Sequence, residues 1–362
     1  MVQWDSGKTQ KRLEAEGAAG GYCMEQKRNA ELDVAKGIAI VLMVLGHMHF
    51  SKVLDHYIYA FHMPIFFFIS GMLFKPRPVK DTLMRKARAL LTPYFVFGGM
   101  YWIIYNSKRY ILHHKTDTML PGLKALLLFP TTNLAVESAL WFLPVMFLTA
   151  AGYCCLYHWI KKDAVLSVTV LALGIVGFAL PKITQYRLPW GMDTAMVALL
   201  FYHIGREVGD HALIDRLYAL EAKRRWLFYP ALIAILAVNA WLIFVNDKVN
   251  MRLVRWAFEP LTLLNALTAI IAYIVVSKCL TDHPATGGSI PVKWLERISM
   301  TSVVYLCTNH TMIKYARSIA TKAVGDMPTL ITVLTFVISM AMMYGLGELI
   351  YRTKLKVIVG RR

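Results

Sequence analysis

The chain has 362 residues, of which 57% are hydrophobic and only 17% are charged, a mixture too apolar for an ordinary soluble domain. Several stretches of about twenty residues carry almost no charge, which is the length of a helix that crosses a bilayer. The net charge of +18 comes from Lys and Arg between these stretches, where such residues orient membrane proteins. Composition therefore excludes a nucleic-acid-binding class and predicts the lipid bilayer as a partner.

The first 35 residues are polar and contain no apolar core, so we expect a cytoplasmic N-terminal segment and no cleavable signal peptide. Membrane insertion then begins with the first apolar span. The five cysteines show no metal-ligand spacing, and four of them lie in or beside apolar stretches. We therefore predict no metal site and interpret these cysteines as small buried residues.

Apolar stretches separated by charged or Pro- and Gly-rich breaks predict an all-α integral membrane protein, a bundle of about ten transmembrane helices. The predicted spans are 36–54, 57–74, 89–106, 141–160, 164–181, 193–209, 227–245, 257–280, 298–318 and 328–351. The transmembrane domain thus covers 36–351, and a basic cytoplasmic tail follows at 352–362. No loop is long enough for a second folded domain, so any chemistry takes place inside the bundle or at its edges.

The distribution of positive charge predicts the orientation. With ten spans both termini lie on one side of the membrane, and that side collects 27 of the 40 Lys and Arg residues. Because loops rich in Lys and Arg face the cytoplasm, we expect both termini to be cytoplasmic. The same asymmetry supports an even number of spans, since removing one span would scramble the pattern downstream.

The first span runs from the charged pair Asp33 and Lys36 to His47. Asp33 and Lys36 are three residues apart and share a helix face. The helical rise places His47 roughly 16 Å from Lys36, near or past the middle of the bilayer. An ionisable group at that depth is costly and marks a cavity or a partner. The alternative is a packed histidine bonded to a neighbouring carbonyl.

The second span opens with Phe61-His-Met-Pro64 and continues to Ser70-Gly71. Because it returns from the outside, His62 enters the same half of the membrane as His47. Two converging imidazoles are suited to act as base and orienting partner, since they titrate near neutral pH. Ser70 lies deeper, and packing beside Gly71 is its simpler interpretation.

A third feature precedes Pro93 on the cytoplasmic side. Arg85 and Arg88 are three residues apart, so they share a face and are able to grip phosphate oxygens together. Basic residues are also expected on this side for orientation alone, and the pair by itself favours that simpler reading.

Taken together, these features resemble acyltransferase family 3, the membrane O-acyltransferases, and particularly its fucose 4-O-acetylase-like branch. The resemblance covers almost the whole chain, and the order and spacing of the motifs carry it. Its further markers are Trp141-Phe-Leu-Pro144, Leu188-Pro-Trp-Gly-Met-Asp193, Phe201-Tyr202 with Gly205, and Ile298-Ser299 through Tyr305 to His310.

The resemblance implies a multi-pass enzyme of the bacterial cytoplasmic membrane that takes acyl groups from cytoplasmic acyl-CoA, with no tightly bound cofactor. Lys36, Arg85 and Arg88 would bind the phosphates of the donor, and His47, His62 and Asp33 would form the catalytic group. His47 would act as general base on the acceptor hydroxyl or carry the acyl group covalently. Many members have arginine where this chain has Lys36, which keeps the charge but lacks the bidentate fork.

The implied acceptor is a sugar hydroxyl of a cell-surface polysaccharide or of its lipid-linked precursor, with acetyl as the expected acyl group. Glu137, Trp141 and Asp193 are the expected substrate-binding residues near the outer membrane edge. Trp141 is equally suited to anchoring a helix at the interface, and Asp193 to binding helices together. Many relatives end in an extracytoplasmic hydrolase-like domain that we do not find here, so polysaccharide-assembly proteins are expected as further partners.

Two other classes of protein fit parts of the pattern. A transporter or flippase for a glycolipid or small solute also needs buried polar groups in its spans. A non-catalytic scaffold in a polysaccharide-assembly complex is the third interpretation. A transporter would need no thioester donor and would tolerate the loss of Arg85 and Arg88.

Overall fold

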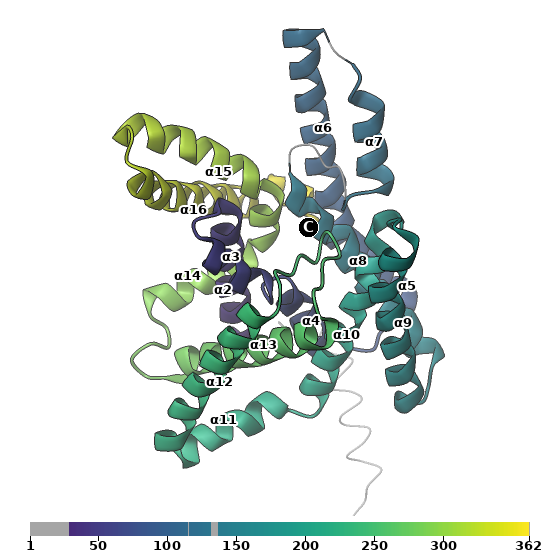
Figure 1. Ribbon diagram of the computed structural model, residues 1–362, viewed down its shortest axis with the longest axis vertical. Helices are drawn as coiled ribbons and strands as arrows, with labels where there is room; N and C mark the ends of the chain where they lie inside the picture. Colours follow the sequence, from purple (N-terminus) through teal and green to yellow (C-terminus); the bar gives the residue numbers. More distant parts are fainter. Residues whose placement is uncertain (1–28, 115, 132–136, 362) are drawn as a thin grey trace, which may run out of the picture.

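A computed structural model describes residues 29–114, 116–131 and 137–361. Of the described residues 82% are helical, and they contain no β-strand, only an isolated bridge between Asn250 and Arg255. The all-α prediction is confirmed. Figure 1 shows α15 and α16 packed side by side on one flank and the hairpin of α6 and α7 projecting from the bundle.

A helix overlaps each predicted span. The corresponding helices are α2 (Ala30–Met48), α4 (Pro64–Met72), α6 (Thr92–His113), α8 (Phe142–Trp159), α9 (Asp163–Thr184), α10 (Met192–Asp210), α12 (Arg225–Val245), α13 (Glu259–Asp282), α15 (Ser302–Val324) and α16 (Pro328–Arg352). Within the described residues, five helices are long and apolar enough to cross a membrane: α8 with the turn before it, α9, α12, α13 and α16. The count of ten and the side of the termini stay predictions.

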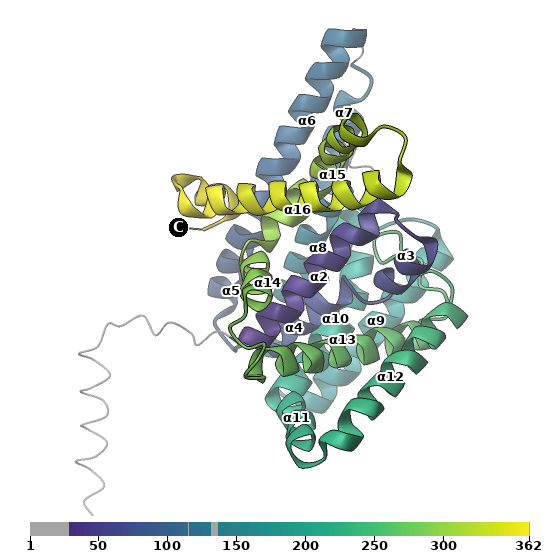
Figure 2. The ribbon, with the colours of Figure 1, turned by 90° about the vertical axis from the view of Figure 1, so that its left-hand side faces the viewer.

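Shorter elements connect these helices. They are α3 (Lys52–Tyr59), α5 (Val79–Lys86), the π-helix η1 (Ala87–Leu91), α7 (Met119–Leu128), α11 (Leu213–Lys223) and α14 (Ile290–Met300), with the 3-10 turns η2 (Ser138–Trp141), η3 (Pro189–Gly191) and η4 (Lys354–Val359). Figure 2 shows α13 and α16 running between two ends of the bundle, with α3 at one end and α5 and the C-terminal residues at the other.

Three predicted boundaries near the N-terminus are wrong. The first helix begins at Ala30 and ends at Met48, six residues earlier than the predicted span at both ends. The second span is broken, because α3 ends at Tyr59 and α4 starts at Pro64, whose fixed φ suits the first turn of a helix. The third helix begins in η1, which contains the predicted start at 89 and precedes Pro93, but it ends at His113, seven residues beyond the predicted end.

Close packing of α4 on α10 fixes the position of the second span. A Cβ atom on Gly71 would lie 1.9 Å from the carbonyl oxygen of Tyr202, and one on Gly205 would lie 2.0 Å from that of Phe68. Only glycine permits this approach of two backbones, and small residues at such crossings are typical of membrane helices. This contact fixes α4 in the bundle, so that the residues before α4 and those after it lie towards opposite ends of the bundle.

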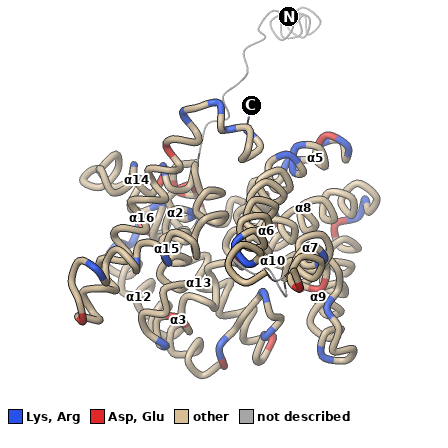
Figure 3. The backbone as a smooth tube through the Cα atoms, turned by 90° about the horizontal axis from the view of Figure 1, so that it is seen from above, with Lys and Arg blue, Asp and Glu red and all other residues tan. Residues whose placement is uncertain are grey.

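The end of the bundle that contains α5 carries a group of positive charges. Figure 3 shows Lys and Arg on α5 and on the C-terminal segment, which lie at the same edge of the view, and further Lys and Arg around the rest of the rim. The C-terminal segment packs against α6 and η1, where the backbone of Gly360 meets that of Arg88. This end is the one that the sequence pattern assigns to the cytoplasm.

Candidate functional site

Two cavities open at opposite ends of α4. The first, of about 250 Å³, is called here the histidine pocket; it is lined by Met43, His47, His49, Tyr59, His62, Met63, Ala139, Trp141, Asn250, Met251, Arg252 and His310. The second, of about 320 Å³, is called the basic pocket; it is lined by Ser70, Leu73, Phe74, Lys75, Arg77, Thr82, Arg85, Lys86, Ala89 and Tyr202. From Met63 to Ser70 or Leu73 the helical rise gives a separation of about 10 to 15 Å.

His47 and His62 meet in the histidine pocket, as their convergence from neighbouring spans predicts. The Nδ1 atom of His62 lies 2.8 Å from the carbonyl oxygen of Ile58, so this nitrogen carries the hydrogen and donates it. The Nε2 atom of His62 is then left with a lone pair. His62 is buried, and its ring makes an edge contact with Tyr59, which also lines the pocket.

Asn309 on α15 determines which nitrogen of His47 carries the hydrogen. The amide nitrogen Nδ2 of Asn309 lies 2.9 Å from Nδ1 of His47. An amide nitrogen only donates, so this orientation of the Asn309 amide, in which Oδ1 is buried without a hydrogen-bond partner among the described residues, leaves the hydrogen of His47 on Nε2. A neutral His47 is thus a hydrogen-bond donor through Nε2, and not a base at that atom.

His310 has the opposite arrangement. Its Nδ1 atom lies 2.7 Å from Oε1 of Glu137, a side chain that is 1% exposed. A carboxylate accepts, so Nδ1 of His310 carries the hydrogen and Nε2 has the lone pair. The ring centroids of His47 and His310 are 4.5 Å apart, with the planes tilted by 37°. A donor and a base therefore lie face to face in one cavity.

The carboxylate of Glu137 is fully engaged with α15. Besides the His310 ring, it accepts from the backbone N–H groups of His310 and Thr311, at 3.2 and 3.3 Å, and from the Thr311 hydroxyl at 3.4 Å. Glu137 was expected to contact substrate. It lies behind the His310 ring and orients the imidazole, and its contact with substrate stays a prediction.

Trp141 lies where a substrate-binding residue was expected. Its indole is buried, and it lines the histidine pocket at the end of η2. An aromatic face in a polar pocket suits the apolar face of a sugar ring. Its burial also separates it from an interfacial anchor, which lies at the level of the lipid headgroups.

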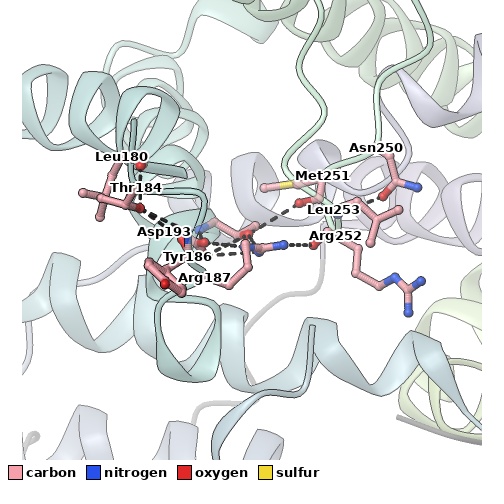
Figure 4. A network of polar contacts seen from close by, with 10 residues as sticks. Leu180, Thr184, Tyr186, Arg187, Asp193, Asn250, Met251, Arg252 and Leu253 are labelled. Atoms are coloured by element: carbon pink, nitrogen blue, oxygen red, sulfur yellow. Dashed lines mark hydrogen bonds and ion pairs between the residues drawn. The ribbon is translucent and has the colours of Figure 1, made fainter. Parts of the chain in front are cut away.

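Asp193 does not line the histidine pocket. Its side chain is completely buried and pairs with Arg187, at 2.5 Å from Oδ2 to Nε and 3.2 Å from Oδ1 to Nη2. Arg187 also donates to the backbone oxygen of Arg252 at 3.0 Å. Figure 4 shows this network, which ties the start of α10 to the loop between α12 and α13. Asp193 thus braces two segments of the fold outside the histidine pocket, and its contact with substrate stays a prediction.

Asp33 lies at the other end of α2 from the histidine pocket. The fourteen residues between Asp33 and His47 correspond to about 21 Å of helix. Asp33 is buried, pairs with Lys36 at 2.7 Å and accepts from the Ser299 hydroxyl at 3.0 Å. Asp33 therefore lies apart from His47 and His62 and binds α2 to α14, and its catalytic role stays a prediction.

The basic pocket contains part of the predicted phosphate-binding group. Arg85 lines it together with Lys75, Arg77 and Lys86. Arg88 is exposed one turn further on and does not line it, and Lys36 is held by Asp33. Four cations around one cavity nevertheless form a site suited to several phosphate oxygens.

Sequence reasoning gave little weight to the residues of α15 and none to the loop at 246–258. Asn309 and His310 lie about 260 residues from His47 in the sequence, so helix periodicity does not predict their contact. The feature of the sequence that marks Asn309 and His310 is that they are two consecutive polar residues within an apolar span. In the described part of the chain, no group of three or more His, Cys, Asp or Glu side chains is arranged to hold a metal ion.

The helices and the two cavities define a polytopic membrane protein with a histidine site at one end and a basic site at the other. A family model described as an acyltransferase domain matches residues 29–350. The chain belongs to acyltransferase family 3.

A search of curated proteins matches Nodulation protein NolL of Mesorhizobium japonicum, which is 31% identical over 122 residues. The match covers 29% of this chain and 33% of that protein, so the chain spans only a third of the length of this relative. No solved structure matches the chain.

Proposed function

We propose that this acyltransferase moves an acyl group, acetyl in the first instance, from acyl-CoA to a hydroxyl of a sugar acceptor. The single observation that carries the proposal is the histidine pocket, where the Glu137–His310 pair faces His47 across 4.5 Å between ring centroids. An imidazole oriented by a carboxylate is suited to act as a general base, and a neighbouring hydrogen-bond donor is suited to stabilise an oxyanion. Acyl transfer to a hydroxyl requires both groups.

The donor is placed in the basic pocket. Coenzyme A carries a diphosphate and a further phosphate, and Lys75, Arg77, Arg85 and Lys86 supply the matching positive charge. The Lys and Arg residues of α5 and of the C-terminal segment support an orientation in which this end faces the cytoplasm, where acyl-CoA is found. The extended pantetheine arm would run along α4 and deliver the thioester to the histidine pocket.

The reaction then needs one base and one donor. Nε2 of His310 takes the proton of the acceptor hydroxyl, and the oxygen forms a bond to the thioester carbonyl carbon. The negative charge that develops on the carbonyl oxygen is stabilised by the Nε2–H of His47. When the tetrahedral intermediate collapses, the C–S bond breaks and the thiolate takes the proton from His310. Glu137 stabilises the imidazolium between these two events.

This scheme gives His47 a role other than general base or covalent acyl carrier. Both earlier roles require a lone pair on Nε2, and the hydrogen bond from Asn309 to Nδ1 favours a hydrogen at that atom. His62 has an available lone pair on Nε2 and a fixed ring, which suits it to accept a hydrogen bond from a second hydroxyl of the acceptor.

The acceptor side is the outer end of the bundle. Trp141 offers a stacking surface, and several polar groups converge on a cavity of about 250 Å³. These features suit a sugar unit of a surface polysaccharide or its lipid-linked precursor, acetylated at the cytoplasmic membrane of a bacterium. The fucose 4-O-acetylase-like branch and partnership with polysaccharide-assembly proteins belong to the same proposal.

The test uses membranes from a host deleted for the gene, with and without the full-length chain. After incubation with acetyl-CoA labelled in the acetyl group, we expect label in the lipid-linked sugar and polysaccharide fractions only when the chain is present. A His310→Ala chain inserted at the same level should leave those fractions unlabelled. Unchanged labelling without the chain, or with His310→Ala, would contradict the proposal and favour a transporter or scaffold.

A further inference from the structure

Arg252 places a guanidinium group in the wall of the histidine pocket. It belongs to the loop at 246–258, which connects α12 to α13 and also contributes Asn250 and Met251 to the pocket. Neither the family features nor the proposed acyl transfer uses this residue. It is half-buried, although the loop itself lies outside the long apolar helices.

The backbone of this loop is held in place from two sides. The carbonyl oxygen of Arg252 accepts from Nη1 of Arg187 at 3.0 Å, and Arg187 is clamped by the buried Asp193. Asn250 and Arg255 exchange backbone hydrogen bonds of 2.7 and 3.0 Å, which close the turn around Arg252. Figure 4 shows the Arg252 side chain extending away from the Arg187–Asp193 network. The guanidinium is therefore presented by a rigid support and is not used to build it.

In the part of the chain that the structure describes, no carboxylate lines the histidine pocket and Arg252 forms no ion pair. Three acids of the surrounding elements are paired with other residues: Asp55 with His49 at 2.8 Å, Glu137 with His310 at 2.7 Å, and Asp193 with Arg187. Partial burial lowers the pKa of Arg252. A guanidinium withdrawn from water without a partner is costly, and an anionic ligand would offset that cost.

We infer that the acceptor carries an oxyanion group, a carboxylate or a phosphate, which Arg252 binds while the reacting hydroxyl lies at His310. This inference rests on the proposed function, because it names the substrate class of the same pocket. The planar guanidinium takes such a group in a two-point contact and so fixes the ring as well as the charge. Arg252 thereby determines which acceptor enters, and the histidines carry out the transfer.

Two sources supply the same chemistry. One is the carboxylate of a sugar acid within the polysaccharide, and the other is the phosphate that joins a sugar to its lipid carrier. Calorimetric titration separates them, using methyl glucuronoside for the first, geranyl diphosphate for the second and methyl glucoside as the neutral reference. The titrations compare the purified full-length protein with its Arg252→Gln variant, since the basic pocket also binds phosphate and only the difference reports on Arg252.

We expect the wild type to bind one of the anionic probes at least about tenfold tighter than methyl glucoside, the loss typical of removing a charged hydrogen bond. Arg252→Gln should weaken the binding of that probe by about tenfold and leave the binding of methyl glucoside unchanged, and Arg252→Lys should restore part of the loss. The matched control is Arg255→Gln, on the same turn but exposed, which should bind like the wild type. Equal affinities of the wild type and Arg252→Gln for both anionic probes would overturn the inference.

The proposed acyltransferase function is tested separately, by measuring acetyl transfer. If Arg252→Gln loses the anion preference and the wild type transfers no acetyl group, the anion site stands and the acyltransferase proposal falls. If the wild type transfers acetyl groups and Arg252→Gln binds every probe normally, acyl transfer stands and the anionic acceptor falls.

Discussion

The amide of Asn309 donates to His47, with 2.9 Å between Nδ2 and Nδ1, and this contact joins two helices far apart in the sequence. It determines the chemical role of His47, because a proton donor at Nδ1 leaves the hydrogen on Nε2. If a carboxylate occupied the position of Asn309, the hydrogen would lie on Nδ1 and Nε2 of His47 would be a base. The side chain at position 309 thus decides whether His47 is a hydrogen-bond donor or a base.

Asn309→Asp is the variant that distinguishes these roles. A carboxylate at this position accepts a hydrogen bond, so it would draw the His47 hydrogen to Nδ1 and remove the donor at Nε2. We expect acetyl transfer to fall by about a hundredfold, as when an oxyanion-stabilising donor is lost. Activity is compared at equal amounts of folded protein, judged by thermal unfolding. A rate equal to or above that of the wild type would instead assign His47 as the base.

Glu137→Gln tests the pair behind the proton transfer. The amide keeps the shape of the side chain but removes the charge that stabilises the His310 imidazolium. We expect kcat to fall by about 10² to 10⁴ while KM for acetyl-CoA stays unchanged, since the donor binds elsewhere. Steady-state rates of CoA release give both constants. A higher KM for the sugar acceptor with normal kcat would return Glu137 to substrate binding.

Arg85→Gln tests the donor end. Loss of one cation from the basic pocket should raise KM for acetyl-CoA by about tenfold or more and change kcat little. The matched control is Lys80→Gln, which removes an exposed charge from the same helix without touching the pocket. Equal KM values of Arg85→Gln and the control for acetyl-CoA would contradict the proposal that the basic pocket binds the donor.

Gly71→Ala tests the packing that separates the two pockets. The added methyl group would lie 1.9 Å from the backbone oxygen of Tyr202, so α4 and α10 would have to move apart. We expect a loss of about 1 to 3 kcal/mol in the free energy of unfolding, the usual range for overpacking. Gly99→Ala on α6, where nothing lies within 4 Å of the new atom, should be neutral or stabilising. Equal thermal midpoints for the two variants would contradict the close contact.

Local pattern predicted most of the helices, because apolar length and charged breaks are properties of contiguous sequence. A helix overlaps each of the ten predicted ranges, and His47 and His62 converge because consecutive helices run in opposite directions. The break between α3 and α4 was missed, although Pro64 marks its end, because the surrounding residues are as apolar as those of a continuous span. A helix boundary is not predicted from the sequence where the hydropathy of the residues is the same on both sides of it.

The sequence predicts only the part of the site that is formed by residues of neighbouring spans. Asp33 lies on the same helix as His47, but periodicity says which face a residue occupies and not how far along the bundle its partners are. The sequence does not predict the pairing of Asp193 with Arg187, because nothing nearby in it shows that Arg187 folds back onto this carboxylate. The contacts of Asn309, His310 and Arg252 join segments distant in the chain, and only the assembled bundle brings them together.

The most direct test of the account is the rate of acetyl transfer by His47→Ala, measured with labelled acetyl-CoA in membranes that contain equal amounts of inserted chain. The loss of the Nε2–H donor predicts a rate about a hundredfold below that of the wild type. His47→Gln, whose amide still donates, should recover part of that loss. Transfer by His47→Ala at the wild-type rate would contradict the assignment of the histidine pocket as the site of acyl transfer.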